Sequence, residues 1–409
     1  MRDAVIVGAG PAGSTAAALL AAHGYDVLLV DKQTFPREKV CGDIISPKTQ
    51  WLLQQIGLLE MFPLHQYQAI ATVRVFAPDG SSFTGKLAPD DGLYGGSLII
   101  PRKEFDHMLK AFACARGAEC LEQCAIHHLT YAENDAVMLQ GYWRGERFDE
   151  TTRVVLAADG VHSRLAKTVH LPRKSRHAMM TSIRGYYQDV KGLDQQIRLY
   201  YDRVRPFIQF GWVIPVSATC ANIGYSTSLE AIRRQPIQRY FAEFLASPKL
   251  IRHVRQAKLI GRLQGCSLAL GTVPLHRVAR NVLFLGDAAR LIDPITGEGI
   301  SNAITSAMIA ADVIHACFGS PANIRARPSA EIMHDFSQYA DRCKQAFGEE
   351  FRQGWKLRRV LQTSNGLTNF AIRRLAARQS AADTVVRMLG EVVPKGDLCS
   401  WKFLTKLVW

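Results

Sequence analysis

The chain has 409 residues, of which 48% are hydrophobic and 21% charged, an ordinary globular composition that excludes a disordered or fibrous protein. Because this length exceeds what one simple core holds, we expect two closely joined domains. The formal net charge of +14 suits either anionic partners, such as anionic lipids or phosphorylated ligands, or a generally basic cytosolic enzyme.

Cysteine usage and the lack of a leader restrict the cellular setting. The nine cysteines are scattered from Cys41 to Cys399 without a Cys-x-x-Cys pair, which indicates a reducing compartment. We interpret Cys120 and Cys124 as buried thiols and expect no metal ion. With no signal peptide and no run near the ~18 apolar residues that span a bilayer, we predict a cytoplasmic protein, soluble or peripherally bound to a membrane.

The N-terminal segment predicts one βαβ unit. Asp3–Val7 and Tyr25–Val30 are short apolar runs typical of buried strands, and Ser14–His23 between them is helical in composition. The first strand leads into Gly8-Ala9-Gly10-Pro11-Ala12-Gly13, a G-x-G-x-x-G pattern, and the second strand ends at Asp31. In this context the pattern predicts a dinucleotide site.

Each residue of this pattern has a physical role. Gly8 permits the tight turn, Gly10 lets the backbone approach a pyrophosphate, and Gly13 lets helix and strand pack closely. The helix N-terminus supplies N–H groups for the phosphates, and Asp31 would accept hydrogen bonds from ribose hydroxyls. FAD and NAD share this ribose, so the rest of the chain must decide between them. The predicted cofactor site includes two neighbours, Ala12 and Lys32.

The middle of the chain changes to a β-rich pattern. Its aromatic and β-branched runs, separated by turn-prone spacers, predict an antiparallel sheet. These runs are Ser182–Val190, Gln196–Tyr201, Ile208–Val216 and Ala221–Thr227. Pro236–Ala246 then predicts an amphipathic helix. From Asn281 the α/β pattern returns, with a strand over Asn281–Leu285, a helix over Gly299–Phe318, a linker over 319–328 and a helical, basic remainder.

A second glycine-rich motif follows the strand Asn281–Leu285. An aspartate at a strand end can bind ribityl hydroxyls, and backbone N–H groups at a glycine-rich helix start can face the flavin N1/O2 edge, where charge develops on reduction. We therefore predict flavin contacts from this segment, at Gly286, Asp287, Pro294, Gly297, Gly299 and Ile300.

With these motifs the chain resembles FAD-dependent oxidoreductases of the para-hydroxybenzoate hydroxylase-like superfamily, and within it the geranylgeranyl reductase family. The similarity runs along most of the chain. It is carried by Phe35-Pro36-Arg37-Glu38-Lys39-Val40-Cys41-Gly42-Asp43, Pro101-Arg102, Asp159-Gly160-Val161-His162-Ser163, Trp212–Pro215 and Gly390-Glu391-Val392-Val393-Pro394. The resemblance implies FAD as cofactor, with Arg37 and Arg102 along it, Asp159 and Asp287 supporting it, and Cys41 and Gly42 beside the flavin.

The fold expected from these features is α/β, with a discontinuous Rossmann-like FAD-binding domain, an inserted antiparallel-sheet substrate domain and a C-terminal helical region. We assign residues 1–65, 98–170 and 272–320 to the first, 66–97 and 171–271 to the second, and 321–409 to the third.

Three chemistries share this scaffold: alkene reduction, aromatic hydroxylation and halogenation. Lys39–Asp43, with its Cys-Gly pair, and Thr296–Ile300, with its Gly-Glu-Gly, resemble the reductases. A third segment, Phe210–Pro215, resembles both the reductases and the halogenases, and it also fits an ordinary core strand. From this segment we predict the substrate-lining residues Phe210, Trp212, Ile214 and Pro215. Carbon–carbon double-bond reduction of a geranylgeranyl or polyprenyl group is our leading hypothesis, and a flavin-dependent monooxygenase or halogenase is the alternative.

Alkene reduction needs a hydride from the flavin and a proton from an acid. Cys41 is the first candidate donor or gate, although a thiol that only packs against the flavin fits equally, and Asp43 is the second candidate. His127, His128 and His162 are interpreted as structural. Since no second G-x-G-x-x-G exists, either NAD(P)H docks transiently or another protein supplies electrons.

We expect a hydrophobic small-molecule or lipid substrate, since half of the sheet's aromatic side chains could line an apolar tunnel. No nucleic-acid partner is predicted, and the oligomeric state stays open. From Arg342 onward, basic residues alternate with apolar ones such as Phe351, Trp355, Phe370 and Trp409. These helices either bind anionic membranes or cap the substrate domain.

Overall fold

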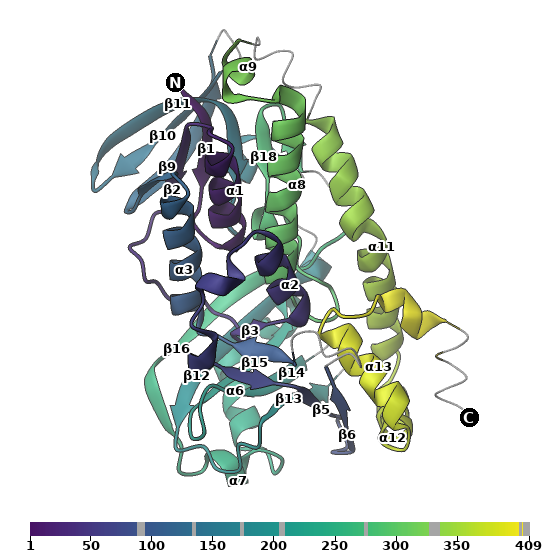
Figure 1. Ribbon diagram of the computed structural model, residues 1–409. Coiled ribbons are helices and arrows are strands. Elements are labelled where there is room, and N and C mark those ends of the chain that lie inside the picture. Colours follow the sequence, from purple (N-terminus) through teal and green to yellow (C-terminus); the bar gives the residue numbers. More distant parts are fainter. Residues whose placement is uncertain are drawn as a thin grey trace.

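The computed structural model describes residues 1–87, 95–132, 136–171, 176–203, 209–273, 277–326, 336–400 and Phe403. Two large sheets, called here the first and second sheet, organise the chain. In Figure 1, helices α1 (Pro11–Ala22), α3 (Arg102–Ala115) and α8 (Ile300–Phe318) stand beside the first sheet. The second sheet lies below it, and α11 (Ser337–Leu361) runs down the side of the molecule from the level of the first sheet to that of the second.

The first sheet has the strand order β17-β18-β11-β1-β2-β8, and all neighbours from β18 to β8 are parallel. Strand β10 extends it as an antiparallel neighbour of β11, and β9 pairs antiparallel with β10. The predicted βαβ unit is confirmed, because β1 and β2 pair in parallel across α1. The strands are β1 (Arg2–Val7), β2 (Val27–Val30), β8 (Glu119–Leu121), β9 (Cys124–Tyr131), β10 (Val137–Trp143), β11 (Glu146–Ala157), β17 (Val278–Ala279) and β18 (Val282–Phe284).

The core of this unit follows from its sequence. Four successive β1 residues, Ala4 to Val7, are buried, as is all of β2, which fits parallel strands covered by helices. Four alanines of α1 are buried, because their small side chains let this helix approach α8 and α3 closely: Ala12, Ala16, Ala17 and Ala18. This packing fixes the N-terminal end of α1 beside the ends of β1 and β2.

The second sheet has the order β16-β12-β15-β14-β13-β5-β6. The four predicted strands are present within a few residues of their expected bounds, but the sheet is mixed, because β5 runs parallel to β13. The predicted helix is α6 (Ile237–Leu245), which covers one face with Phe241 and Phe244. The strands are β5 (Thr72–Phe76), β6 (Ser82–Lys86), β12 (Met179–Gln188), β13 (Gln196–Arg203), β14 (Gln209–Pro215), β15 (Ala221–Ser228) and β16 (Lys258–Ala269).

A small sheet of β3 (Ile44–Ile45), β7 (Ser97–Ile99) and β4 (Gln68–Ile70) connects the two parts. Strand β3 leads directly into α2 (Pro47–Gln55), whose N-cap Ser46 accepts a hydrogen bond from the Thr49 N–H. The chain therefore reaches from the cysteine motif at residue 41 to the first turn of α2 within a few residues.

The C-terminal region consists of α11, α12 (Asn365–Ala376) and α13 (Gln379–Leu389). Helix α13 packs on β6, where a side chain at Gly85 would collide with the backbone of Ala382. The prediction of a linker over 319–328 is wrong for Pro321–Ala326, which forms the short helix α9 after Gly319 ends α8 with φ +66°; residues 327 and 328 lie outside the described range. A proline at the first helical position is compatible with this turn.

One further expectation needs correction. Cys120 is not a free thiol, because it forms a disulfide with Cys114 at the end of α3; Cys124 is free and buried as expected. By length and hydropathy alone, α8 is the one helix among the described residues that could cross a membrane. Since its most apolar 18-residue window is 61% buried inside the fold, it is only weak support for a span.

Candidate functional site

A cavity of about 850 Å³ has walls from both large sheets. The glycine turn after β1 and the end of β2 form one part of it, and β14 forms another. Most of the predicted site residues meet in its wall: Gly8, Gly10, Ala12, Asp31, Lys32, Arg37, Cys41, Gly42, Arg102, Asp159, Gly286, Asp287, Gly297, Gly299, Ile300, Phe210, Trp212 and Ile214.

Backbone contacts fix the conformation of the nucleotide end of the cavity, which consists of Gly8–Gly13 and Asp31. Gly8 has φ +105°, and a side chain at Gly13 would collide with the Gly8 carbonyl oxygen. The two Asp31 carboxylate oxygens accept the N–H groups of Ala9 at 2.8 Å and Gln33 at 2.9 Å. The carboxylate is thereby fixed beside the glycine turn, with lone pairs left for ribose hydroxyls.

Arg37 and Arg102 are held in place by one buried carboxylate, Asp106. Arg102 donates to it from Nε at 2.7 Å and from Nη2 at 2.8 Å, and Arg37 Nη1 lies 3.0 Å from it. Arg37 also lies 4.0 Å from Asp31. The bidentate pair restricts rotation of the Arg102 guanidinium, and the two carboxylates on either side hold Arg37 along the cavity.

Cys41 lies in the cysteine loop, residues 39–43, with its thiol half-buried. Burial is the main cause that raises the pKa of this thiol, and Arg102, which hydrogen-bonds the sulfur, acts in the opposite direction. The carboxyl groups of Asp43 and Glu298, when ionised, act in the same direction as burial. At neutral pH the thiol therefore retains its proton, as a proton donor requires.

Asp43 connects the cysteine loop to the second sheet. Fully buried and with φ +65°, it accepts the Tyr186 hydroxyl at 2.6 Å and the Asn222 side-chain N–H at 2.7 Å. Asn222 also donates to the Cys41 carbonyl oxygen at 2.8 Å and accepts the Trp212 indole N–H at 3.0 Å. Burial raises the pKa of Asp43, while the hydrogen bonds from Tyr186 and Asn222 lower it. This carboxylate lies behind the cavity wall, where it positions the loop that carries the thiol.

The flavin-edge loop, residues 293–299, approaches the cavity from the opposite side. Asp287, just before it, has the Lys39 ammonium 3.6 Å away. At the loop's end, Glu298 accepts the backbone N–H groups of Ile300 at 2.8 Å and Ser301 at 3.4 Å, and so caps α8. The loop thus presents a carboxyl group and a helix N-terminus together.

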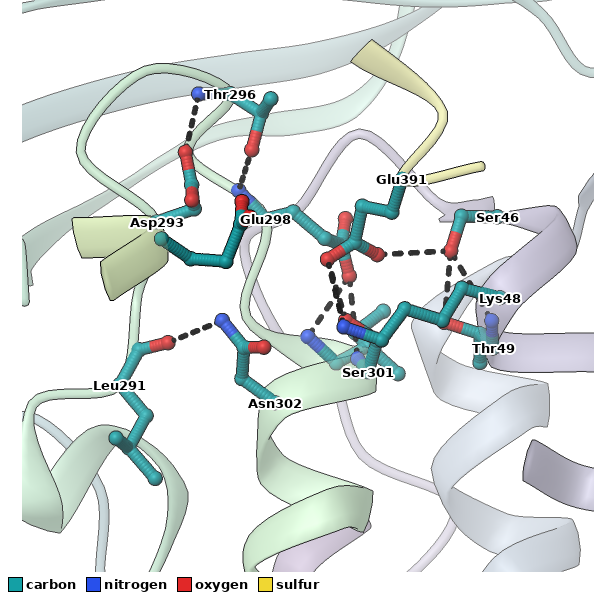
Figure 2. Close-up of polar contacts among 12 residues, drawn as sticks. Ser46, Lys48, Thr49, Leu291, Asp293, Thr296, Glu298, Ser301, Asn302 and Glu391 are labelled. Atoms are coloured by element: carbon teal, nitrogen blue, oxygen red, sulfur yellow. Dashed lines mark hydrogen bonds and ion pairs between the residues drawn. The ribbon is translucent and has the colours of Figure 1, made fainter. Parts of the chain in front are cut away.

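Figure 2 shows a second carboxyl group, that of Glu391, at the same helix turn. It accepts the Ser301 hydroxyl at 2.8 Å and the Ser46 hydroxyl at 3.1 Å, and the Lys48 ammonium lies 3.8 Å away. Burial, followed by the nearby Glu391 charge, raises the pKa of Glu298 to about 8. The sequence motif that contains Glu391 predicts no role for this residue.

The C-terminal region also supports the flavin-edge loop from behind. Lys395 donates to Glu350 at 2.9 Å and lies 2.7 Å from Asp293, whose other oxygen accepts the N–H groups of Ile295 and Thr296. Arg358 of α11 donates to the Pro294 carbonyl oxygen at 2.9 Å. These contacts fix the loop to elements that follow it by 50 to 100 residues.

Strand alternation sorts the substrate-lining candidates. Phe210, Trp212 and Ile214 face the cavity, whereas a side chain at Gly211 would collide with Phe244 of α6. Ile214 also lies so close to Gly42 that a side chain there would touch it. The substrate wall and the cysteine loop are therefore in direct contact. Phe207, one of the aromatic candidates, lies outside the described residues.

Four predicted residues lie outside the cavity wall. Gly13 packs against the glycine turn, Asp43 lies behind the cysteine loop, Pro294 packs on Gly354 of α11, and Pro215 pairs with Ala221 at the sheet end. Conversely, His127 and His162, interpreted as structural, line the cavity near Asp159. No spacing signal distinguished them, because β9 and the turn after β11 meet only in the fold.

The polar groups along the cavity wall fit FAD. A fixed carboxylate lies at the nucleotide end, a glycine turn opens α1 between the two ends, and Asp287 with the Gly297–Gly299 backbone lies at the other. Gly297 has φ +71°, and nothing lies within 4 Å of the point where a side chain would begin, so the backbone there is open to a ligand. A family profile described as FAD binding domain matches residues 1–319. The chain belongs to this family.

Known relatives of this FAD-binding chain are reductases. It is 27% identical over 400 residues to digeranylgeranylglycerophospholipid reductase of Methanocella arvoryzae, covering 96% of each chain. It is also 27% identical over 337 residues to menaquinone reductase of Mycobacterium tuberculosis, covering 76% of each. These matches agree with the motifs, and the chain is a FAD-dependent oxidoreductase of the geranylgeranyl reductase family.

Solved structures show the same fold. A geranylgeranyl bacteriochlorophyll reductase-like protein from Thermoplasma acidophilum superposes with a TM-score of 0.76 at 23% identity, covering 100% of this chain and 95% of that one. The flavin-dependent brominase Bmp2 superposes with a TM-score of 0.74 at 19% identity, covering 95% and 93%. Since a halogenase and a reductase-like protein fit almost equally well, the fold alone does not select the chemistry.

Proposed function

We propose that this protein reduces carbon–carbon double bonds of a geranylgeranyl or other polyprenyl chain carried by a lipid, quinone or tetrapyrrole. One observation carries the proposal: the Cys41 thiol, whose pKa is raised by burial, lies in the same cavity wall as the Arg102 guanidinium and the apolar side chains of the second sheet. An isolated alkene is a poor hydride acceptor, so an acid must add a proton as the hydride arrives. The relatives' substrates, a geranylgeranyl phospholipid and menaquinone, support a polyprenyl group.

Each part of the chain has a role in this reaction. FAD, when bound, supplies the hydride. Asp31, Arg37 and the glycine turn hold its adenosine and phosphate portions, while Asp287 and the Gly297–Gly299 backbone hold the flavin side. Cys41 donates the proton to the alkene carbon, and its S–H bond breaks as the new C–H bond forms. Asp43 keeps the cysteine loop on the second sheet and acts as a positioning residue.

Phe210, Trp212 and Ile214 exclude water and hold the alkene. An isoprenoid chain loses no hydrogen bonds when it binds to an apolar wall, whereas a charged substrate would be buried there without hydrogen-bond or ion-pair partners. For the electron donor we propose NAD(P)H or another reductant that docks transiently, because the sequence holds no second dinucleotide motif.

We further propose peripheral contact with anionic membranes through the corner between α11 and α12. Val360, Leu367 and Phe370 are exposed there, with Phe370 59% exposed, and Arg359 and Arg374 belong to the same two helices. Other apolar residues in the basic segment from Arg342 onward face the interior of the protein. Phe351, Leu375 and Phe403 are buried, and the Trp355 indole N–H donates to the Gly271 carbonyl oxygen. Trp401 and Trp409 lie outside the described residues.

Anaerobic single-turnover chemistry tests the proposed reaction. The FAD-loaded protein is reduced, freed of oxygen and mixed with a geranylgeranyl phospholipid or with menaquinone in detergent. We expect the flavin to be reoxidised and the product to gain two hydrogen atoms by mass spectrometry. Flavin that stays reduced until oxygen is admitted, with an oxygenated or halogenated product, would establish the monooxygenase or halogenase alternative.

A further inference from the structure

The carboxyl groups of Glu298 and Glu391 meet in a setting short of positive charge. Both accept hydrogen bonds from Ser301, one from its N–H and the other from its hydroxyl (Figure 2). Like charges in a largely buried site cannot both ionise without cost, and such pairs often hold one proton between them. The charges around the pair therefore decide its protonation state.

Among the described residues, the nearby cations are already engaged. Arg102 contacts Asp106 through two hydrogen bonds, and it shares this carboxylate with Arg37, which also faces Asp31. Lys395 contacts Asp293 and Glu350. Lys48 of α2 remains, 3.8 Å from Glu391 and partly exposed. A lysine beside Glu391 compensates one of the two carboxyl charges and leaves the other to be neutralised by a proton.

The backbone at Glu391 gives an independent sign of function. This residue has φ +61°, a left-handed conformation that non-glycine residues seldom adopt. It directly follows Gly390, at which α13 ends, so the chain places a carboxyl group where a glycine would turn more easily. Strained positions that persist are concentrated at functional sites. The strain delivers this carboxyl group to Ser46 and Ser301, which belong to two different helix starts.

Resting on the proposed function, we propose that Glu298 and Glu391 share one proton and return it to Cys41 after each alkene reduction. In that reaction the thiol S–H bond breaks, the alkene gains a proton and a hydride, and the flavin is oxidised. The Cys41 thiolate then takes the proton from the Glu298 carboxylic acid, so an O–H bond breaks and an S–H bond forms. Solvent resupplies the proton through Glu391, whose neighbour Lys48 is 37% exposed on its side chain.

The positions of the groups suit this direction of transfer. Glu298 lines the cavity and acts electrostatically on Cys41. Glu391 lies outside the cavity wall and is hydrogen-bonded to Ser46 at the start of α2. The Ser301 hydroxyl, which donates to Glu391, can rotate and relay a proton between the two carboxyl groups. Since the pKa of Glu298 is raised to about 8, this group holds a proton at neutral pH.

Infrared spectroscopy of the flavin-loaded protein tests the shared proton without any substrate. We expect a protonated-carboxyl band at neutral pH that shifts in heavy water, disappears above about pH 8 and is absent from Glu298→Gln. Glu349→Gln, at an exposed position of α11, is the matched control and should keep the band. A wild-type spectrum without this band at neutral pH would overturn the proposal.

Lys48→Met provides a second variant that leaves both carboxyl groups in place. Removing the neighbouring cation should move the disappearance of the band to higher pH, an effect that a purely structural role would not produce. An unchanged titration in this variant would count against a pair that shares one proton. This measurement remains decisive if Glu391→Gln fails to fold.

Turnover rates measured with excess chemical reductant then show whether the carboxyl pair returns its proton to Cys41 or only holds it. In Glu391→Gln the first turnover should proceed at nearly the wild-type rate, because Cys41 already holds a proton, whereas later turnovers should slow at least tenfold. Equal slowing of first and later turnovers would overturn delivery through Glu391. Alkene reduction without the infrared band would contradict this inference alone. The band without alkene reduction would instead overturn the proposed function and with it the delivery to Cys41.

Discussion

The two ends of the cavity are built in different ways. The nucleotide end comes from one continuous βαβ unit, in which Gly8, Gly13 and Asp31 are fixed by backbone contacts to their near neighbours. The end that carries Cys41 and Glu298 is assembled from the cysteine loop, α2, α3, the flavin-edge loop and the segment after α13. Cofactor capture is thus a local property of the chain, whereas proton chemistry depends on long-range packing.

The largest expected effect is that of Cys41→Ser, which should impair proton transfer and leave cofactor binding intact. Serine keeps the size of the side chain but is a far weaker acid, so we expect retained FAD and a 10²- to 10⁴-fold slower anaerobic single turnover, about 3–5 kcal/mol. Stopped-flow absorbance of the flavin measures the rate. Cys220→Ser, at a half-buried thiol outside the cavity wall, is the control. An unchanged rate in Cys41→Ser would make this thiol a packing residue.

Asp43→Asn, tested in parallel, separates donor from positioner. The amide keeps the shape but would face the donating Asn222 side chain, so we expect lower stability and only a modest loss of rate. A loss as large as that in Cys41→Ser would identify Asp43 as the proton donor.

The next largest effect concerns cofactor affinity. Asp287→Ala should weaken FAD binding by on the order of 1.5–3 kcal/mol, because a hydrogen bond between the ribityl chain and a carboxylate is lost. Glu298→Gln should weaken it less, since the backbone of the flavin-edge loop is retained. Fluorescence titration of the flavin-free protein with FAD measures both affinities. Equal affinity of wild type and Asp287→Ala would remove Asp287 from the cofactor site.

A third effect appears in the pH dependence of stability. The pKa of Glu298 is about 8 in the folded chain against its ordinary value of 4.5. This group therefore favours folding below about pH 4.5, and the contribution is lost as pH rises through about 8. Glu298→Gln should therefore gain in melting temperature relative to wild type across that range. Glu349→Gln should show no such gain, since hydrogen bonding to Arg352 lowers the pKa of Glu349. Parallel melting curves for wild type and Glu298→Gln would refute the assignment.

The smallest expected effect is at the membrane corner. Phe370→Asp should reduce sedimentation with anionic vesicles at low salt by roughly fivefold, about 1 kcal/mol. Tyr142→Asp, at a residue of β10 that is 52% exposed, is the control and should bind as wild type does. No binding of the wild type to anionic vesicles would end the membrane proposal. A truncation after Gly390 is unsuitable here, because it would also remove Glu391 and Lys395.

What the sequence could predict follows the same division. The glycine turn, Asp31 and the alternation of Phe210, Trp212 and Ile214 depend on neighbours in the chain, so the sequence can predict that they meet in one cavity wall. Their roles toward FAD and substrate stay predictions. The partners of Asp43 lie 143 and 179 residues away, and Ser46 and Glu391 are 345 residues apart. No local pattern encodes such contacts. The disulfide of Cys120 and the helix at Pro321–Ala326 were missed for a simpler reason, since short spacings and mixed composition fit several conformations.

The placement of Glu391 has a consequence for how the protein is made. Residues 1–319, which carry every predicted FAD contact, leave the ribosome well before Glu391 and Lys395 do. A nascent chain can therefore form its nucleotide end, and even retain cofactor, while the carboxyl pair and the support for the flavin-edge loop are still missing. Reactive reduced flavin would gain its proton supply only when the last helices have docked, so translation order itself separates loading from turnover.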